Sequence, residues 1–257
     1  MKKTRRNIYS KYTPLFFGLF LLMCNSIENS DNEAVRFDRF ARVVFRQVYP
    51  SLAEQILNDY AIKEGICLDL GCGSGYLGIE VAKRSELTVI GVDIDSVAVR
   101  IARNNIKRAN LAHRMTAEQG DVHQLRFEDE SADLIISRGS FIFWRNISQA
   151  FREIYRILKP GGVAFIGGGM GRAITPEQKA EIKLQLEKEG WLDRCRMKVT
   201  PVMMQETLEH LNIQNYRIMG DGTEDSGCQC GMWVEIRKAT VAQRVLFHTA
   251  DYAVTRR

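Results

Sequence analysis

A stretch with four glycines in eleven residues, LDLGCGSGYLG at positions 68–78, limits what this chain can fold into more than any other segment. It follows a short apolar run, where a buried strand is expected to end. Glycine loses more conformational entropy on folding than any other residue, so its repeated use needs a reason. The pattern indicates either a loop without fixed structure or a tight turn whose backbone a ligand approaches closely.

Hydrophobic patterns switch between strand and helix periods around this turn and predict alternating elements. Strands are predicted over 65–70, 87–95, 113–122, 132–139 and 163–169. Helices are predicted over 76–84, 96–109 and 148–159. Ser96 is the expected N-cap of the second helix, and Pro160-Gly161-Gly162 ends the third. Parallel strands joined by helices give a sheet with helices on both faces.

Further elements flank this core. Apolar residues at helical spacing over 35–59 predict two helices, separated at Pro50, that precede the sheet and would cover the site. Thr175-Pro176 and Thr200-Pro201 each place a capping side chain before a proline, which is typical of a helix start. Segments 215–221 and 232–238 are predicted to close the sheet as an antiparallel pair.

These elements predict an α/β fold with a Rossmann-like, doubly wound, seven-stranded sheet, mostly parallel with an antiparallel last strand. The predicted domain covers 33–238, after a basic and apolar segment with a linker at 1–32 and before a tail at 239–257. In such sheets ligands bind outside the carboxyl ends of the strands, where the strand order changes direction. The glycine turn lies at such an end, which favours a turn that a ligand approaches.

The net charge of +5 is concentrated in the first thirty residues, which hold five basic side chains and the single acid Glu28. Without that segment the net charge falls from +5 to +1, and no basic stripe interleaved with aromatic residues remains. A composition of 45% hydrophobic and 26% charged residues is ordinary for a globular protein. A nucleic-acid partner is therefore not expected.

The N-terminal segment combines a basic start with an apolar core at 14–24, which is short for a transmembrane helix. Three interpretations stay open: a signal for export or lipid anchoring, a helix in peripheral contact with a membrane, or a start codon placed too far upstream, with Met23 as the true start. The cytosolic cofactor inferred below disfavours export. The expected location is the cytoplasm, with residues 1–24 as the segment that would contact a membrane.

The six cysteines form no CxxC pair and no cluster with zinc-site spacing. Cys67 lies in an apolar run and Cys72 in the glycine turn, as expected of small buried residues in a reducing compartment. Cys228 and Cys230, with Cys195, are candidates for a soft metal or metalloid such as arsenite. Incidental cysteines in a hairpin loop explain the same pattern, and no metal site is predicted.

The glycine spacing narrows the choice of ligand. Gly71, Gly73 and Gly75 give G-x-G-x-G, whereas a dinucleotide-binding turn has its third glycine one position later and a P-loop needs Gly-Lys-Ser/Thr. Asp93 ends the second predicted strand, about 20 residues past the turn, where a carboxylate accepts hydrogen bonds from both ribose hydroxyls. A further acid, Asp121, follows the third strand. Together these features point to a nucleoside cofactor.

Four segments, CLDLGCGSGYLG, VIGVDID, GDVH and ILKPGG, resemble the motifs of class I S-adenosylmethionine-dependent methyltransferases, with a resemblance that spans residues 65–238. LKPGG is similar to the branch that holds many small-molecule and quinone-pathway methyltransferases. The resemblance implies an enzyme that moves a methyl group from S-adenosylmethionine to a small-molecule acceptor by in-line displacement. The amino-group signature Asn/Asp-Pro-Pro-aromatic is replaced by Ser137-Arg138-Gly139-Ser140, which argues against N-methylation of adenine or glutamine.

The resemblance also implies which residues bind the cofactor: Asp69, Gly71, Cys72, Gly73, Gly75, Asp93, Ile94, Asp121, Val122 and Ser137. Asp69 and the turn backbone would face the methionyl part, and Asp93 would hold the ribose. Ile94 would pack on the adenine, Asp121 with Val122 beside it would meet the adenine amino group, and Ser137 would lie near the transferring methyl. Structural alternatives exist, with Asp69 as a cap, Asp121 as a turn former, and Ile94 and Val122 as core residues.

No catalytic residue is predicted, because a sulfonium carries its own leaving group, and alignment with exclusion of water accelerates the transfer. Arg138 could hold a substrate carboxylate or phosphate, or instead pair with a structural acid or point to solvent. His123 is a minor candidate for a base. Phe141, Phe143 and Trp144 could line a substrate pocket, although a core or surface-helix role is favoured.

The alternative function is a non-catalytic S-adenosylmethionine-binding regulatory or membrane-tethered accessory protein, and the oligomeric state stays open.

Overall fold

One seven-stranded sheet organises the part of the chain that the computed structural model describes, residues 32–191, 199–221, 231–240 and 242–243. The strand order is β3-β2-β1-β4-β5-β7-β6. The strands are β1 (Ile66–Leu70), β2 (Thr88–Asp93), β3 (Met115–Gln119), β4 (Ala132–Arg138), β5 (Leu158–Gly167), β6 (Tyr216–Met219) and β7 (Trp233–Arg237). β7 runs antiparallel to both neighbours, and the pairs among β1 to β5 are parallel. The predicted fold class is confirmed.

The strand order changes direction between β1 and β4. From β1 the chain continues outward through β2 and β3, and from β4 it continues through β5 toward the opposite edge. The loops that follow β1 and β4 therefore leave the sheet in opposite directions and open a crevice at the carboxyl ends of the two strands. The glycine turn follows β1, so it lies at this crevice.

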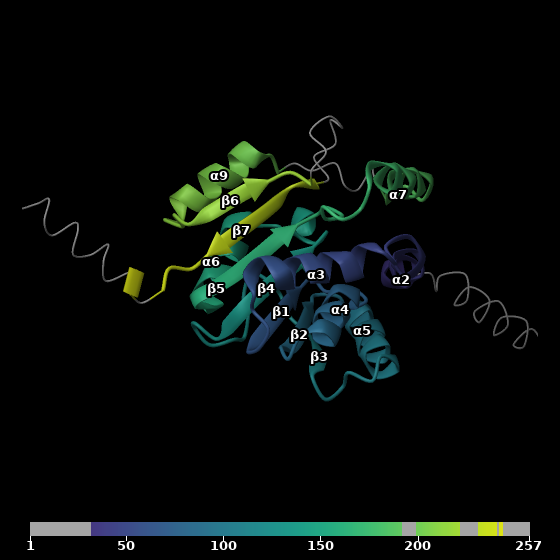
Figure 1. Cartoon of the computed structure of the whole chain (residues 1–257), viewed down its shortest axis with the longest axis horizontal. Helices are drawn as coiled ribbons and strands as arrows, with labels where there is room; N and C mark the ends of the chain where they lie inside the picture. The colour runs from purple at the N-terminus through teal and green to yellow at the C-terminus, as the bar shows by residue number, and fades with distance from the viewer. Residues whose placement is uncertain (1–31, 192–198, 222–230, 241, 244–257) are drawn as a thin grey trace, which may run out of the picture.

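Helices cover both faces of the sheet (Figure 1). They are α2 (Glu33–Val44), α3 (Val48–Tyr60), α4 (Tyr76–Arg84), α5 (Ser96–Arg108), α6 (Ile147–Ile157), α7 (Pro176–Lys188) and α9 (Pro201–His210), with a short 3-10 turn η1 (Phe141–Phe143). One core cluster packs helices α2, α3, α4 and α5 against one face of the sheet. A second cluster packs α6 and α9 against the other face. Leu134 and Ile136 of β4 belong to the first cluster and Ile135 to the second, as strand alternation requires.

Capping side chains fix where several helices start. Thr175 accepts a hydrogen bond from the Gln178 backbone while the Gln178 side chain accepts from the Thr175 N–H, a complete capping box before Pro176. Thr200 caps α9 in the predicted way. At α5 the cap is Asp95 rather than the predicted Ser96, because Asp95 has extended backbone angles and accepts from Val97 N at 2.8 Å, whereas Ser96 is already helical.

Two other boundaries differ from the sequence predictions. The break between α2 and α3 precedes Pro50, which lies in the first turn of α3, where its missing N–H has no helical acceptor. The helix predicted over 148–159 ends at Ile157, and β5 already begins at Leu158. Leu158 pairs with Ala132, and the register then shifts before Val163 pairs with Leu134, so the Pro-Gly-Gly segment forms an irregularity inside the strand.

None of the described helices combines the length and apolar character needed to cross a bilayer. Residues 1–24, and the cysteines Cys195, Cys228 and Cys230, lie outside the described residues, so the predictions made for them stay predictions.

The described core does not draw on the N-terminal segment. The two buried clusters and the residues packed against them extend from Phe37 to Ile236. We therefore expect a chain that starts at Ser26 to fold, with a melting temperature within about 4 °C of the full chain, which corresponds to about 1 kcal/mol for a domain of this size. Circular dichroism melts of the two chains measure this. Loss of a cooperative transition in the shorter chain would show that the removed residues pack into the core.

Candidate active site

The glycine turn after β1 has a left-handed backbone at every second position. Gly71, Gly73 and Gly75 have φ angles of 63°, 53° and 77°, a region that side chains other than glycine rarely enter. At Gly71 a side chain would also collide with Ser140, which packs directly against the turn. At Gly71 it is therefore another part of the chain, Ser140, that approaches the backbone closely. At Gly73 the backbone is more open, because a Cβ there would meet only the Phe37 ring at 3.6 Å.

Asp93, at the end of β2, holds this turn in place. One carboxylate oxygen accepts the Gly73 N–H at 2.8 Å and the other accepts the Asp95 N–H at 2.9 Å. Burial raises the pKa of Asp93, and these two backbone donors counteract that rise. Each carboxylate oxygen has a second lone pair, so Asp93 keeps the capacity to accept hydrogen bonds from a ligand.

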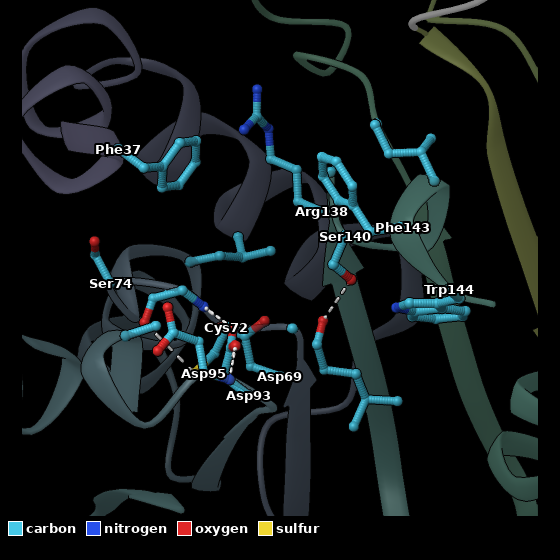
Figure 2. A pocket seen from close by; sticks show the side chains of 18 of the residues that line it. Phe37, Asp69, Cys72, Ser74, Asp93, Asp95, Arg138, Ser140, Phe143 and Trp144 are labelled. Atoms are coloured by element: carbon cyan, nitrogen blue, oxygen red, sulfur yellow. Dashed lines mark hydrogen bonds between the residues drawn. The ribbon is translucent and has the colours of Figure 1, made fainter. Parts of the chain in front are cut away.

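A cavity of about 510 Å³ opens at the carboxyl ends of β1 and β4, within the size range of small-molecule sites. Eight of the ten predicted cofactor residues line it: Asp69, Gly71, Cys72, Gly73, Asp93, Ile94, Asp121 and Val122. Figure 2 shows Asp69, Asp93 and Asp95 gathered on one side of it, with Phe37, Arg138 and Phe143 across from them. The remaining two predicted residues, Gly75 and Ser137, are not part of its lining.

Ser137 lies behind the cavity wall. Its side chain is fully buried and hydrogen-bonds the Ser140 hydroxyl at 2.7 Å, and Ser140 in turn donates to the carbonyl of Leu70 at 3.1 Å. Ser140 lines the cavity and takes the position that the sequence analysis gave to Ser137. Gly75 is the N-cap of α4 and shapes the turn without facing the cavity.

Asp69 is a buried acid at the floor of the site. Its side chain accepts the Gly78 N–H at 3.0 Å, which ties the end of β1 to the first turn of α4. Burial raises the pKa of Asp69 to about 7, with the Asp93 charge adding to the rise and the Gly78 N–H opposing it. Asp69 therefore changes its charge near neutral pH, and a cationic ligand beside it would favour the ionised form.

Asp121 and His123 form a closed pair at one edge of the cavity. Asp121 accepts from the backbone and ring nitrogens of His123, at 3.0 and 2.5 Å, and from Arg145 at 3.2 Å. The backbone donor of His123 is the main reason why the pKa of Asp121 is lowered. His123 Nε2 accepts the Asn146 N–H at 3.1 Å, so the ring proton lies on Nδ1 and points to Asp121. Both ring nitrogens of His123 are therefore engaged within the chain, which makes it a poor candidate for the base.

Aromatic side chains from distant parts of the chain form the opposite side of the cavity. Trp144 and the 61% exposed Phe143 line it, whereas Phe141 is a core residue. Helices α2 and α3 do cover the site and contribute Phe37 and Tyr49, and the turn between them contributes Phe45. Lys179 and Lys183 of α7 also line the cavity. The sequence analysis did not single out these lysines or the three rings, because no local pattern distinguishes a cavity-facing side chain on a helix from one that faces elsewhere. The sequence feature that could have pointed to the three rings is the presence of two predicted helices ahead of the first strand.

Among the described residues no three His, Cys, Asp or Glu side chains converge as a metal site would require. The fold and site together define a Rossmann-like protein with a G-x-G-x-G turn at the ligand crevice of its sheet. Residues 67–162 match the family described as a methyltransferase domain.

A solved structure from Methanococcus maripaludis, described as a candidate S-adenosyl-L-methionine-dependent methyltransferase, is 37% identical and superposes with a TM-score of 0.72. The match covers 80% of this chain and 92% of that one. The chain therefore belongs to the class I S-adenosylmethionine-dependent methyltransferases, a family whose cofactor is S-adenosylmethionine.

Curated relatives are more distant. A sterol 24-C-methyltransferase of Aspergillus fumigatus is 28% identical over 63% of this chain and 44% of that protein. A malonyl-[acyl-carrier protein] O-methyltransferase of Bacillus cereus is 31% identical over 51% of this chain and 47% of that protein. The chain spans less than half the length of these relatives, so their acceptors are properties of those proteins.

The raised pKa of Asp69 predicts a specific pH dependence of stability. The unfolded carboxyl titrates near pH 4 and the folded one near pH 7, so between these values the folded state holds a proton that the unfolded state has lost. The free energy of unfolding of the wild type should therefore fall, relative to that of Asp69→Asn, as the pH rises from 4 to 7, and the difference should be constant above 7. The asparagine oxygen still accepts the Gly78 N–H.

Urea unfolding across pH 4.5–8 measures this difference, with the exposed Glu64→Gln as the matched control. Parallel curves for wild type and Asp69→Asn would contradict a raised pKa at Asp69.

Proposed function

We propose that this protein is an enzyme that transfers the methyl group of S-adenosylmethionine to a small apolar acceptor. The observation that carries the proposal is that a single cavity joins two unlike halves. One half contains the glycine turn with Asp69 and Asp93, and the other half contains aromatic and apolar side chains from α2, α3 and η1. Cofactor and acceptor would meet at the carboxyl ends of β1 and β4.

The residues in the first half fit the cofactor. The left-handed turn leaves the backbone at Gly73 open toward the cavity, and Asp93 ends the neighbouring strand with acceptor capacity to spare. Ile94 is 61% exposed at the strand end, which is unusual for a core residue and suits a surface on which the adenine would pack. Asp69, Asp121 and Val122 would complete the contacts. When bound, the cofactor supplies an activated methyl group and its own neutral leaving group.

The chain's contribution to the transfer is orientation and exclusion of water. The rings of Phe37, Phe45 and Trp144 would cover the acceptor, and their apolar surface would keep water away from the reacting atoms. Tyr49 lines the cavity too, but burial raises its pKa, so it is a poor base. Because both ring nitrogens of His123 already have partners in the chain, the acceptor atom should be nucleophilic without help from these two side chains.

The relatives named as sterol and malonyl-[acyl-carrier protein] methyltransferases support a small-molecule acceptor with an apolar body. We place the enzyme in the cytoplasm, where its cofactor is made, and keep membrane contact through residues 1–24 as a prediction.

The alternative, a cofactor-binding protein without activity, differs in one measurable respect. Incubation of cell-extract fractions with radiolabelled S-adenosylmethionine should give a labelled small molecule that mass spectrometry identifies. Cofactor binding without any labelled product would favour the alternative.

Asp93 should dominate cofactor affinity. Asp93→Ala removes the ribose acceptor and the clamp on Gly73, so S-adenosylhomocysteine should bind about 10- to 1000-fold more weakly, at about 1.5–3 kcal/mol per hydrogen bond to a charged group. Calorimetric titration measures this, and NAD should bind far more weakly than S-adenosylhomocysteine to the wild type.

Asp95→Ser is the matched control, since serine keeps an N-cap acceptor for α5. Its affinity should stay within about threefold of wild type. Thermal melts establish that both variants are folded. Equal losses in the two variants would place the ribose at Asp95 instead.

A further inference from the structure

Arg138 carries a positive charge into the acceptor half of the cavity. It ends β4, and its guanidinium lies over the Phe45 ring, 4.0 Å from the ring centre, and 5.3 Å from the centre of the Tyr49 ring. Its Nε donates to the Gly169 carbonyl at 2.9 Å. Figure 2 shows the side chain across the cavity from Asp69 and Asp93. Stacking and hydrogen bonds therefore fix this charge on an aromatic surface.

Helix α7 brings a second positive charge to the same cavity. Lys179 and Lys183 lie one turn apart and both line it. The buried Lys179 ammonium pairs with Asp221 at 3.3 Å and donates to the Asp221 carbonyl. Half-buried Lys183, in contrast, makes no ion pair or hydrogen bond with any residue in the described ranges.

None of the described carboxylates that line this cavity pairs with Lys183. Asp93, Asp95 and Asp121 lie at the cofactor end and accept the backbone and side-chain donors described above. Glu33 is exposed at the start of α2.

Asp221 is buried and already has its donors. The backbone N–H groups of Met170 and Gly171 lie 2.7 and 2.8 Å from its oxygens, and Trp233 Nε1 lies at 3.0 Å. Asp221 has Lys179 as its counterion, so the acceptor half combines apolar walls with the guanidinium of Arg138 and the ammonium of Lys183.

We propose that the acceptor is an apolar molecule that carries one oxyanion, a carboxylate or a phosphate, and that Arg138 and Lys183 bind this group. The inference rests on the proposed function and names the substrate class of the same site. A guanidinium binds a planar oxyanion through two parallel N–H bonds, and an ammonium adds a less directional contact. Apolar walls strengthen both contacts, because they exclude water. The anion thereby fixes how the acceptor lies relative to the transferring methyl.

Matched ligands test this directly. 2-Naphthoate, 2-naphthyl phosphate and the neutral 2-naphthamide share one apolar ring system and differ in charge. Each is titrated calorimetrically into the full chain saturated with S-adenosylhomocysteine. At least one of the two anions should bind about tenfold or more tightly than the amide, as expected for a charge-assisted pair. The tighter of the two anions identifies whether a carboxylate or a phosphate is the preferred group.

Variants assign the effect to the two cations. Lys183→Ala should reduce the preference for the anion over the amide, and Lys183→Glu should abolish or reverse it. Lys188→Ala is the matched control, because Lys188 is exposed on the same helix and lies outside the cavity lining. Arg138→Gln should lower anion affinity further, but Arg138 also holds the Gly169 loop, so the Lys183 variants carry the test if this variant does not fold.

Two outcomes overturn the inference: naphthamide binding as tightly as both anions, or an unchanged preference in Lys183→Glu. A separate titration with S-adenosylhomocysteine alone distinguishes this failure from failure of the proposed function. If that cofactor product binds and no preference for anions appears, only the inference about the acceptor is wrong. If the cofactor product does not bind, the proposed function is wrong as well.

Discussion

The hydrogen bond from the Gly73 N–H to the Asp93 carboxylate is the contact on which the site depends. It joins the turn after β1 to the end of β2, two adjacent parallel strands, and so fixes a backbone that would otherwise have the freedom of three left-handed glycines. The Cys72 N–H adds a bond to the Val92 carbonyl at 3.0 Å in the same place. With these bonds formed, the direction of the turn and the start of α4 are set together.

The far side of the cavity is held in a different way, by side chains. Arg172 forms a bidentate ion pair with Asp59, with distances of 2.7 and 2.5 Å, and its backbone N–H donates to the Gln55 side chain at 3.0 Å. Both partners belong to α3. Buried Asp221 gathers two backbone donors from the segment after β5 and one lysine from α7, a charge that would be costly to bury without them. These contacts position α3, α7 and the intervening loop around the acceptor space.

This difference explains how far sequence could predict the site. The cofactor half is made of strand ends and the turns that follow them. Strand ends can be located from the hydrophobic period and from glycine, so the sequence could place Asp69, Asp93 and Asp121 at this cavity. The acceptor half depends on which face of α2, α3 and α7 turns inward, and tertiary packing alone decides that. Ser137 was misplaced for a related reason. Beyond the last strand residue, Arg138, Gly139 with a φ of 78° reverses the chain, and Ser140 rather than Ser137 reaches the cavity.

The extent of the family match is consistent with this division. Residues 67–162 include the glycine turn, Asp93, Asp121 and Arg138, and they exclude α2, α3 and α7. Within that range, the backbone geometry of strand ends and turns forms the cofactor half of the site. Outside it, the helices around the acceptor pack on the core and are oriented by ion pairs and side-chain hydrogen bonds, which a few substitutions can replace without disturbing the turn. Acceptor specificity can therefore change in this fold while the cofactor site stays constant, and Lys183, on a helix outside the matched range, is placed to contribute to it.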